Sequence, residues 1–289
     1  MNRREFISTS FISLTTMESL KDLRSFGEAL PSAETMPMLF VGHGSPMNAV
    51  EENEFSAGWR KVGKELPTPQ AILCISAHWE TRGTYVTAME KPKTIYDFYG
   101  FPPEMYNLKY PAPGNLALAQ ETTTLVKKAK VQLDSEWGLD HGSWSVLRRM
   151  YPDANIPALQ LSIDHFKSPE WHYQLAQELA ALRKKGVLIL GSGNMVHNLR
   201  MVNWENPHEP YDWAQEANAK FKELIAGGNH RPLIEYSTLG KAAMLSVPTP
   251  EHYLPMLYIL GLKGEREAIQ FFNDKAVMGS VSMTSFRVG

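Results

Sequence analysis

Five short apolar runs alternate with longer amphipathic stretches, and this alternation constrains the fold more than any other feature of the chain. The runs are almost continuously apolar, as expected of strands that are buried on both faces of a parallel sheet. They are "PMLFVGH", "AILCISAH", "PALQLSID", "VLILGSG" and "AAMLSVP". The stretches with helical spacing cover 54–66, 114–131, 168–186 and 211–228. Strands that alternate with helices predict an α/β fold in three layers, α/β/α, around a mostly parallel, mixed central sheet.

Two segments depart from this alternation. The segment from about 90 to 113, read from "KPKTIYDFYGFPPEMYNLKYPAPG" (91–114), contains five prolines and four tyrosines and has no periodicity. Such a long irregular stretch inside a compact domain is more often functional than idle. The last residues, "AVMGSVSMTSFRVG", predict a β-ribbon or an edge strand.

The overall composition excludes several classes of protein. The formal net charge of the 289 residues is −2, without a block of lysine and arginine, so we expect neither a nucleic-acid partner nor an anionic membrane partner. No apolar run approaches the roughly 18 residues of a membrane-spanning helix. The single cysteine, Cys74, excludes an intrachain disulfide and a cysteine-based zinc site, and its apolar surroundings predict a buried thiol.

The first 35 residues differ in character from the rest of the chain. "MNRREF" carries the paired arginines of a twin-arginine export signal, but Glu18, Lys21 and Asp22 interrupt the apolar region that should follow. We therefore expect an N-terminal arm over 1–35, a possible decayed export signal with a short helix at 17–29, and a single domain over 36–289. The expected location is cytoplasmic, and export through the twin-arginine-like N-terminus is the alternative.

Four histidines follow predicted strands: His43, His78, His197 and His252. In open α/β sheets, ligands bind outside the carboxyl ends of the strands. Histidine is a common ligand of zinc and iron, so the shared placement predicts a histidine-rich metal site. A fifth histidine, His141 in "GLDHGSW", directly precedes a predicted helix.

The remaining histidines fit other roles. His172 lies within a predicted helix and is expected to pack, whereas His208 and His230 lie in polar loops and are expected to be solvated. His165 also follows a strand and is a candidate to contact a metal ligand without binding the metal itself. Glu80 comes two residues after His78, so on an extended chain both side chains would face the same way.

Six ordered motifs now allow a family comparison: "GHGSPMNA", "ISAHWET", "IYDFYGFPPEMY", "GLDHGSWSVL", "GSGNMVHNL" and "PTPEHYLPM". With these motifs the chain resembles the class III extradiol ring-cleaving dioxygenases, in their 4,5-DOPA dioxygenase branch, from about residue 36 to the C-terminus. The resemblance implies a LigB-like α/β/α fold and one divalent metal ion, Zn²⁺ or Fe²⁺. It also implies a catechol substrate whose ring is cleaved beside its two hydroxyls with O₂.

The resemblance also implies roles for individual residues. His43 and His78 match metal ligands. His252 matches a further ligand, although Glu251 stands beside it and more distant relatives use a carboxylate there. His197 matches the acid/base histidine and is a possible fourth ligand, and His141 matches a histidine of the pocket that handles substrate or oxygen.

The aromatic segment completes the expected site. We expect "IYDFYGFPPEMY" to form a wall or lid over the metal, with Tyr96, Tyr99 or Phe101 stacking on the substrate ring. The alternative is a surface loop packed by its own tyrosines. Two other functions remain open at this point: a zinc-dependent hydrolase with Glu251 or Glu80 as base, and a metal-binding homologue without turnover.

Overall fold

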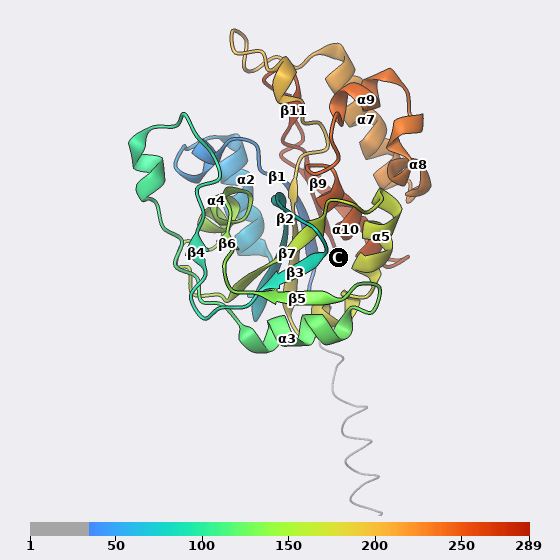
Figure 1. Ribbon diagram of the computed structural model, residues 1–289. Coiled ribbons are helices and arrows are strands. Elements are labelled where there is room, and N and C mark those ends of the chain that lie inside the picture. Colours follow the sequence, from blue (N-terminus) through green and yellow to red (C-terminus); the bar gives the residue numbers. More distant parts are fainter. Residues whose placement is uncertain (1–34) are drawn as a thin grey trace, which may run out of the picture. The chain divides into compact units, whose positions relative to one another are not determined.

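The computed structural model describes residues 35–289 and contains a mixed eight-stranded sheet (Figure 1). Apart from Thr35, the expected N-terminal arm and its possible helix lie outside the described residues. Four strands form the centre of the sheet in the order β7-β2-β8-β1, and each is parallel to its neighbours. They are β1 (Met38–Gly42), β2 (Ala71–Thr81), β7 (Ala158–Asp164) and β8 (Val187–Gly193). All four coincide with predicted apolar runs.

Shorter strands extend the sheet on both sides. Beyond β7 lie β3 (Thr84–Thr87), antiparallel to it, and β5 (Val131–Asp134), parallel to β3. Beyond β1 lie β12 (Ser285–Val288) and β9 (Ile269–Phe272), both in antiparallel pairs. The predicted C-terminal ribbon is present as β10 (Ala276–Val277) and β11 (Val281–Ser282). The final strand, β12, is not at the edge of the sheet, because β9 lies outside it.

Helices cover both faces of the sheet, which confirms the three layers. Successive residues of a strand point to opposite faces, and Leu73 and Cys74 accordingly belong to two separate apolar clusters. The cluster around Leu73 includes residues of α3 (Leu116–Leu125), α5 (Pro169–Gln177), α7 (Asp212–Ala226) and α10 (Leu254–Leu262). The cluster around the buried Cys74 includes residues of α2 (Glu54–Glu65) and α4 (His141–Met150).

Three predicted elements differ from the structure. The run 242–248 is not a strand: it falls on helix α9 (Lys241–Ser246), because a short apolar run with two alanines is also compatible with a helix. The predicted helix 114–131 ends at Leu125, before β5. The predicted helix 168–186 is divided into α5 and α6 (Ala180–Arg183).

The irregular segment 90–113 is anchored beside the start of α4. Its two-residue strand β4 (Lys93–Thr94) pairs with β6 (Gly138–Leu139), and the amide of Ile95 donates to the carbonyl of Leu139. The remaining short elements are α8 (Arg231–Ile234) and the 3₁₀ turns η1 (Pro46–Ala49), η2 (Pro103–Asn107), η3 (Leu199–Met201) and η4 (Tyr236–Thr238). Within 35–289, no helix combines the length and the apolar character that crossing a membrane requires.

Candidate metal centre and substrate cavity

Five histidines line one cavity of about 450 Å³ at the carboxyl end of the central strands. His43 directly follows β1, His78 lies near the end of β2, and His197 comes four residues after β8. His141 is the first residue of α4. His252 is delivered by the turn between α9 and α10, so the prediction that it follows a strand is wrong. Tertiary structure therefore gathers histidines from five separate segments.

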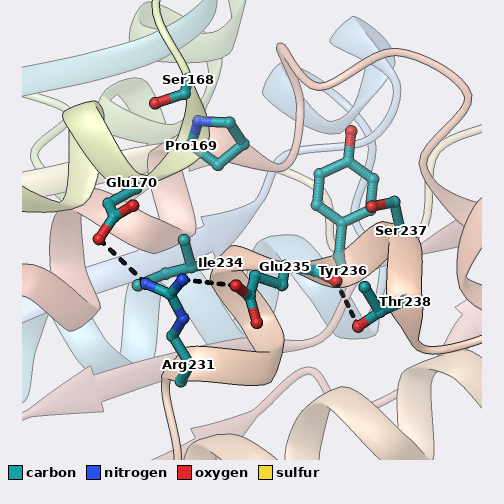
Figure 2. Close-up of a pocket in the computed structure, with 9 residues that line it drawn as sticks. All are labelled: Ser168, Pro169, Glu170, Arg231, Ile234, Glu235, Tyr236, Ser237 and Thr238. Atoms are coloured by element: carbon teal, nitrogen blue, oxygen red, sulfur yellow. Dashed lines mark hydrogen bonds and ion pairs between the residues drawn. The ribbon is translucent and has the colours of Figure 1, made fainter.

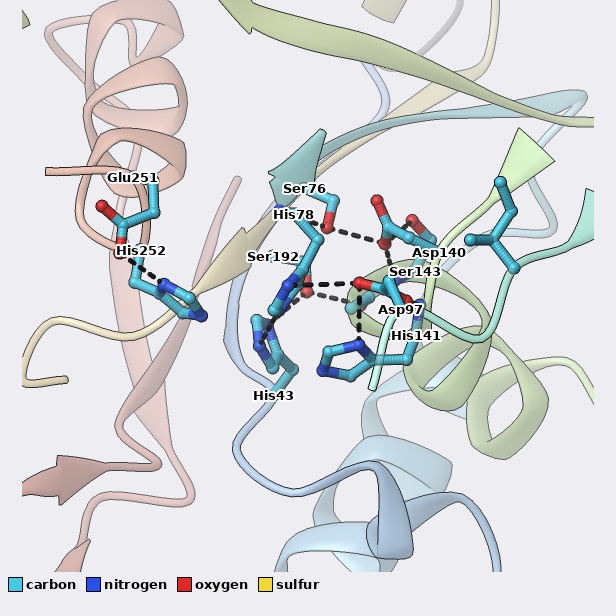
Figure 3. A network of polar contacts seen from close by, with 12 residues as sticks. His43, Ser76, His78, Asp97, Asp140, His141, Ser143, Ser192, Glu251 and His252 are labelled. Carbon is cyan, nitrogen blue, oxygen red and sulfur yellow. Dashed lines mark hydrogen bonds and ion pairs between the residues drawn. The ribbon is translucent and has the colours of Figure 1, made fainter. Parts of the chain in front are cut away.

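The ligand atoms of these histidines fall into two groups, and within each group they lie close enough together to share one ion. The Nε2 atoms of His43 and His78 are 3.1 Å apart. Figure 3 shows the rings of His43, His78 and His141 directed toward a common space, with His252 across from them. The ring of His252 is centred 4.9 Å from that of His78 and 5.3 Å from that of His43. One ligand atom each from His43, His78 and His141 forms a group within 4.8 Å, and so does one each from His197, Glu251 and His252.

A serine sets the tautomer of His43. Its Nδ1 lies 3.0 Å from the hydroxyl of Ser192, and that hydroxyl donates to the carbonyl of Gly142 at 2.5 Å. A hydroxyl has one hydrogen, so Ser192 must accept from His43, and Nδ1 carries the ring hydrogen. The lone pair of His43 is therefore on Nε2, which faces His78, as in histidines that bind metals.

Asp97 sets the tautomer of two further histidine rings, those of His78 and His141. Its Oδ2 lies 3.2 Å from Nδ1 of His78 and 3.0 Å from Nδ1 of His141 (Figure 3). Its Oδ1 accepts from the backbone amide of His141 at 3.0 Å. Since a carboxylate only accepts, both rings carry their hydrogen on Nδ1 and leave Nε2 free. Although burial opposes it, the hydrogen bond from His141 lowers the pKa of Asp97, so this carboxyl is charged at neutral pH.

The backbone fixes the position of His252. Its carbonyl accepts from the amide of Asn194 at 2.8 Å, just beyond the end of β8. A Cβ atom on Gly193 would stand 2.2 Å from this carbonyl oxygen, so the close approach requires glycine. Nδ1 of His252 lies 3.1 Å from Oε1 of Glu251, which also accepts from Thr249. Glu251 is therefore placed to orient the ring of His252 from behind.

Burial keeps the three predicted ligand histidines neutral. Desolvation, followed by repulsion between neighbouring imidazoles, lowers the pKa of His43, His78 and His252 well below its usual value. In His78 the charge of Asp97 opposes this effect. Neutral imidazole is the form that binds a metal ion, so the cluster is ready to coordinate at neutral pH.

His197 occupies a different position in the cluster. Its ring stacks on that of His252, with centroids 3.5 Å apart and an angle of 11° between the planes. Its backbone amide donates to Ser246 at 2.9 Å, which ties the loop after β8 to the end of α9. Burial, followed by the charge of His141, lowers the pKa of His197 to about 4. The side chain is therefore neutral at pH 7 and able to accept a proton.

A buried carboxylate supports the start of α4. Asp140 caps this helix and accepts from the amide and the hydroxyl of Ser143, from Ser76 at 2.8 Å and from Gln160 at 2.7 Å. Burial, followed by the charge of Asp97, raises the pKa of Asp140. This network fixes the helix turn that carries His141.

The aromatic segment forms one wall of the cavity. Phe98, Tyr99 and Phe101 line it, and the ring of Phe98 is centred 5.6 Å from that of His141 in an edge-on arrangement. Tyr96 does not line the cavity: its hydroxyl donates to the carbonyl of Leu108, and its ring packs against Phe98 and Trp144. Sequence reasoning missed Phe98 and Asp97, although both lie in the "IYDFYG" stretch it singled out.

Glu80 and the other histidines lie outside the cavity lining. Nδ1 of His165 lies 2.9 Å from Oε1 of Glu80 at the surface. As predicted, His172 packs inside the protein, where its Nδ1 lies 2.9 Å from the hydroxyl of Tyr258. His208 is exposed, whereas His230 is partly buried and lies 2.9 Å from the hydroxyl of Tyr173.

A second hollow of about 380 Å³ lies between the start of α5 and the α8–η4 region (Figure 2). It contains none of the predicted site residues. Its arginine, Arg231, donates to Glu170 and to Glu235, so its charge is already matched by two carboxylates. The histidine cavity is therefore the candidate site.

Comparison with known proteins agrees with this geometry. Residues 35–286 match the family model described as the catalytic LigB subunit of aromatic ring-opening dioxygenase. The chain is 49% identical over 266 residues to a 4,5-DOPA dioxygenase extradiol of Escherichia coli K12, covering 91% of this chain and 98% of the relative. A protein of the same name from Beta vulgaris is 35% identical, with coverage of 86% and 94%.

A solved structure matches the fold as well. The crystal structure of an uncharacterized protein from Escherichia coli K12 superposes with a TM-score of 0.78 at 48% sequence identity. The match covers 88% of this chain and all of the other one (100%).

Proposed function

This chain belongs to the LigB family of aromatic ring-opening dioxygenases and is a metal-dependent extradiol dioxygenase, and from this premise we propose its substrate and the roles of its residues. The proposed substrate is a catechol such as DOPA, the compound in the names of the curated relatives, cleaved beside its two hydroxyls with O₂. The comparisons do not favour the hydrolase or the homologue without turnover.

We propose that His43, His78 and His252 hold the metal ion through neutral imidazole nitrogens. The donor set fits, because Nδ1 of His43 and of His78 is engaged by Ser192 and Asp97 respectively, and their free Nε2 atoms lie 3.1 Å apart. Three neutral ligands leave coordination positions open for a bidentate catechol. A bound Fe²⁺ supplies the electron transfer between catechol and O₂ that Zn²⁺, with its single oxidation state, does not. We therefore propose Fe²⁺ as the metal of the active enzyme.

His197 is proposed as the acid/base residue. A catechol hydroxyl must lose its proton when the ring binds, and a neutral histidine at the cavity wall can accept that proton. His197 lines the cavity and is held neutral by burial. His141, whose Nδ1 is occupied by Asp97, presents Nε2 to the cavity and is proposed to position substrate or oxygen by a hydrogen bond.

The aromatic wall is proposed to bind the substrate ring. Phe98 and Phe101 meet edge to face with their centroids 5.2 Å apart and line the cavity beside His141. Apolar rings at this place can stack on a catechol and exclude water from it. Tyr99 lines the same wall nearer to solvent, whereas Tyr96 is proposed to support Phe98 from behind.

The convergence of the Nε2 atoms of His43 and His78 carries this proposal. The test is O₂ uptake by protein reconstituted with Fe²⁺ under anaerobic conditions and then mixed with aerated catechol or DOPA. We expect O₂ uptake together with a yellow ring-cleavage product, and neither with Zn²⁺-loaded protein. Binding of Fe²⁺ without O₂ uptake for any catechol would contradict the proposal.

A further inference from the structure

The loop between β8 and α7 places two opposite charges at the opening of the histidine cavity (Figure 1). Leu199, at the start of η3, and Trp204, in the stretch that follows it, line the cavity although they are 65% and 76% exposed. Arg200 directly follows Leu199, Glu205 directly follows Trp204, and both charged residues are exposed. One loop therefore presents a cation and an anion, each beside a residue of the cavity lining.

The protein itself leaves both charges without a partner. Within 35–289, neither Arg200 nor Glu205 takes part in an ion pair. The arginine of the second hollow differs in this respect, because Arg231 donates to Glu170 and to Glu235. Arg200 and Glu205 can therefore contact a ligand at the opening without first giving up an ion pair.

The inner part of the cavity offers a charged substituent no partner of its own. Among the described residues that line it, none is a lysine or an arginine. Its one carboxylate, Asp97, already contacts His78 and His141. Burial of an unpaired charge is costly, so the charged groups of a substrate have to be matched at the opening.

We propose that Arg200 and Glu205 recognise the amino-acid group of a catechol such as DOPA, with the arginine binding its carboxylate and the glutamate its ammonium group. The carbon chain of DOPA is attached to the ring on the side away from the hydroxyls. A ring whose hydroxyls lie against the histidines therefore directs this chain toward the opening. There, Leu199 and Trp204 can cover the carbon chain, and the planar guanidinium of Arg200 suits a carboxylate, which it can bind through two parallel hydrogen bonds. This inference rests on the proposed function, because it requires that placement of the ring.

Four catechols separate the two charges. DOPA carries both charged groups, dihydrocaffeate carries only the carboxylate, dopamine carries only the ammonium group, and 4-propylcatechol carries neither. The measurement is kcat/KM of the Fe²⁺-loaded enzyme for each compound, divided by the value for 4-propylcatechol. This ratio cancels any difference in the amount of folded, metal-loaded protein between variants.

Variants of the two residues should have opposite selectivity. In Arg200→Gln, we expect the ratio for dihydrocaffeate to fall by roughly fivefold, the upper end of what an exposed ion pair contributes, while the ratio for dopamine does not fall. In Glu205→Gln, we expect a fall of the same size for dopamine and none for dihydrocaffeate. Both variants should lower the ratio for DOPA. Added salt should lower the ratio for dihydrocaffeate in the parent but not in Arg200→Gln, since salt screens exposed charges.

Arg266→Gln and Glu265→Gln are the matched controls. Both residues are exposed and lie in the turn before β9. Because β12 is antiparallel to both β1 and β9, β9 runs in the direction of β1, and the turn before it lies at the end of the sheet opposite the cavity. These variants should keep the ratios of the parent enzyme.

The outcomes distinguish failure of the inference from failure of the proposed function. If the parent cleaves 4-propylcatechol but Arg200→Gln and Glu205→Gln both keep its ratios, the inference is wrong and the proposed function stands. Equal losses in the two control variants would also overturn the inference, since they would show an effect of surface charge in general. If none of the four catechols is cleaved, the proposed function itself fails, and this inference fails with it.

Discussion

The imidazole rings of His197 and His252 stack face to face, with centroids 3.5 Å apart and planes inclined by 11°. Only His252 has a carboxylate behind it, Glu251, whose Oε1 lies 3.1 Å from its Nδ1. Such support is typical of a metal-binding histidine. The arrangement therefore favours His252 as the ligand and leaves its neighbour available for proton transfer.

His197→Gln should separate these two roles. We expect the metal content and the fold of the variant to match the parent, while turnover falls by roughly 10²–10⁴-fold, the usual contribution of a positioned proton-transfer group. Metal analysis and single-turnover rates on the same preparation provide the measurement. A variant that has lost its metal would identify His197 as an obligatory fourth ligand instead.

Substitution of a proposed metal ligand should instead lower the metal content together with the activity. His43→Ala and His78→Ala each remove one of the three nitrogens proposed to bind the metal, so we expect little bound metal and no turnover in either variant. Elemental analysis after dialysis against a weak chelator measures the occupancy. His165→Ala is the control, because that histidine is exposed and pairs with Glu80 outside the cavity lining. Full occupancy in both ligand variants would refute the assignment.

The sequence predicted the parts of this site that depend on strands. The apolar runs that end at His43 and His78 are difficult to interpret as anything other than buried parallel strands. The carboxyl ends of such strands meet at one edge of the sheet. The position of His197 could be predicted in the same way, because it comes shortly after the apolar run that forms β8. His252 was expected beside them for a wrong reason, since the run before it forms α9 and a helix–helix turn delivers the side chain.

Asp97 shows what the sequence could not predict. Its role arises because the irregular segment 90–113 passes beside the start of α4, through the pairing of β4 with β6. No local pattern encodes that long-range contact, so a lone carboxylate among aromatic residues has no evident partner in the sequence. The boundary near residue 35 and the cellular location stay predictions as well.

Asp97→Asn should weaken metal binding as well as turnover. The substitution keeps the size of the side chain but removes the charge that orients His78 and His141 through their Nδ1 atoms. Loss of such support behind a metal ligand typically lowers metal affinity or activity by about 10–100-fold. Competition with a chromogenic chelator measures the affinity. Glu80→Gln is the matched control, since it removes the charge beside the exposed His165, and equal effects of both substitutions would argue against a specific role for Asp97.

The buried histidine outside the site should make stability depend on pH. His172 is fully buried and lies between the hydroxyl of Tyr258 and the carbonyl of Asp164. Burial lowers its pKa from 6.5 to about 4 in the folded protein. Between these values the unfolded chain binds a proton at this position and the folded protein does not, so the free energy of unfolding decreases as pH falls from about 6.5 to about 4. A shift of this size corresponds to at most about 3 kcal/mol.

His172→Gln should therefore flatten this part of the stability profile. The variant can lose hydrogen bonds and start from a lower free energy of unfolding, so the informative quantity is the change between pH 6.5 and pH 4, which should be up to about 3 kcal/mol smaller than in the parent. Urea unfolding of the metal-loaded proteins at several pH values provides the measurement. His208→Gln carries the same substitution at an exposed loop position and should keep the parent's pH dependence. If His172→Gln and the parent lose the same free energy over this interval, the buried His172 is not a source of acid sensitivity, and the histidines of the metal site become the groups to test next.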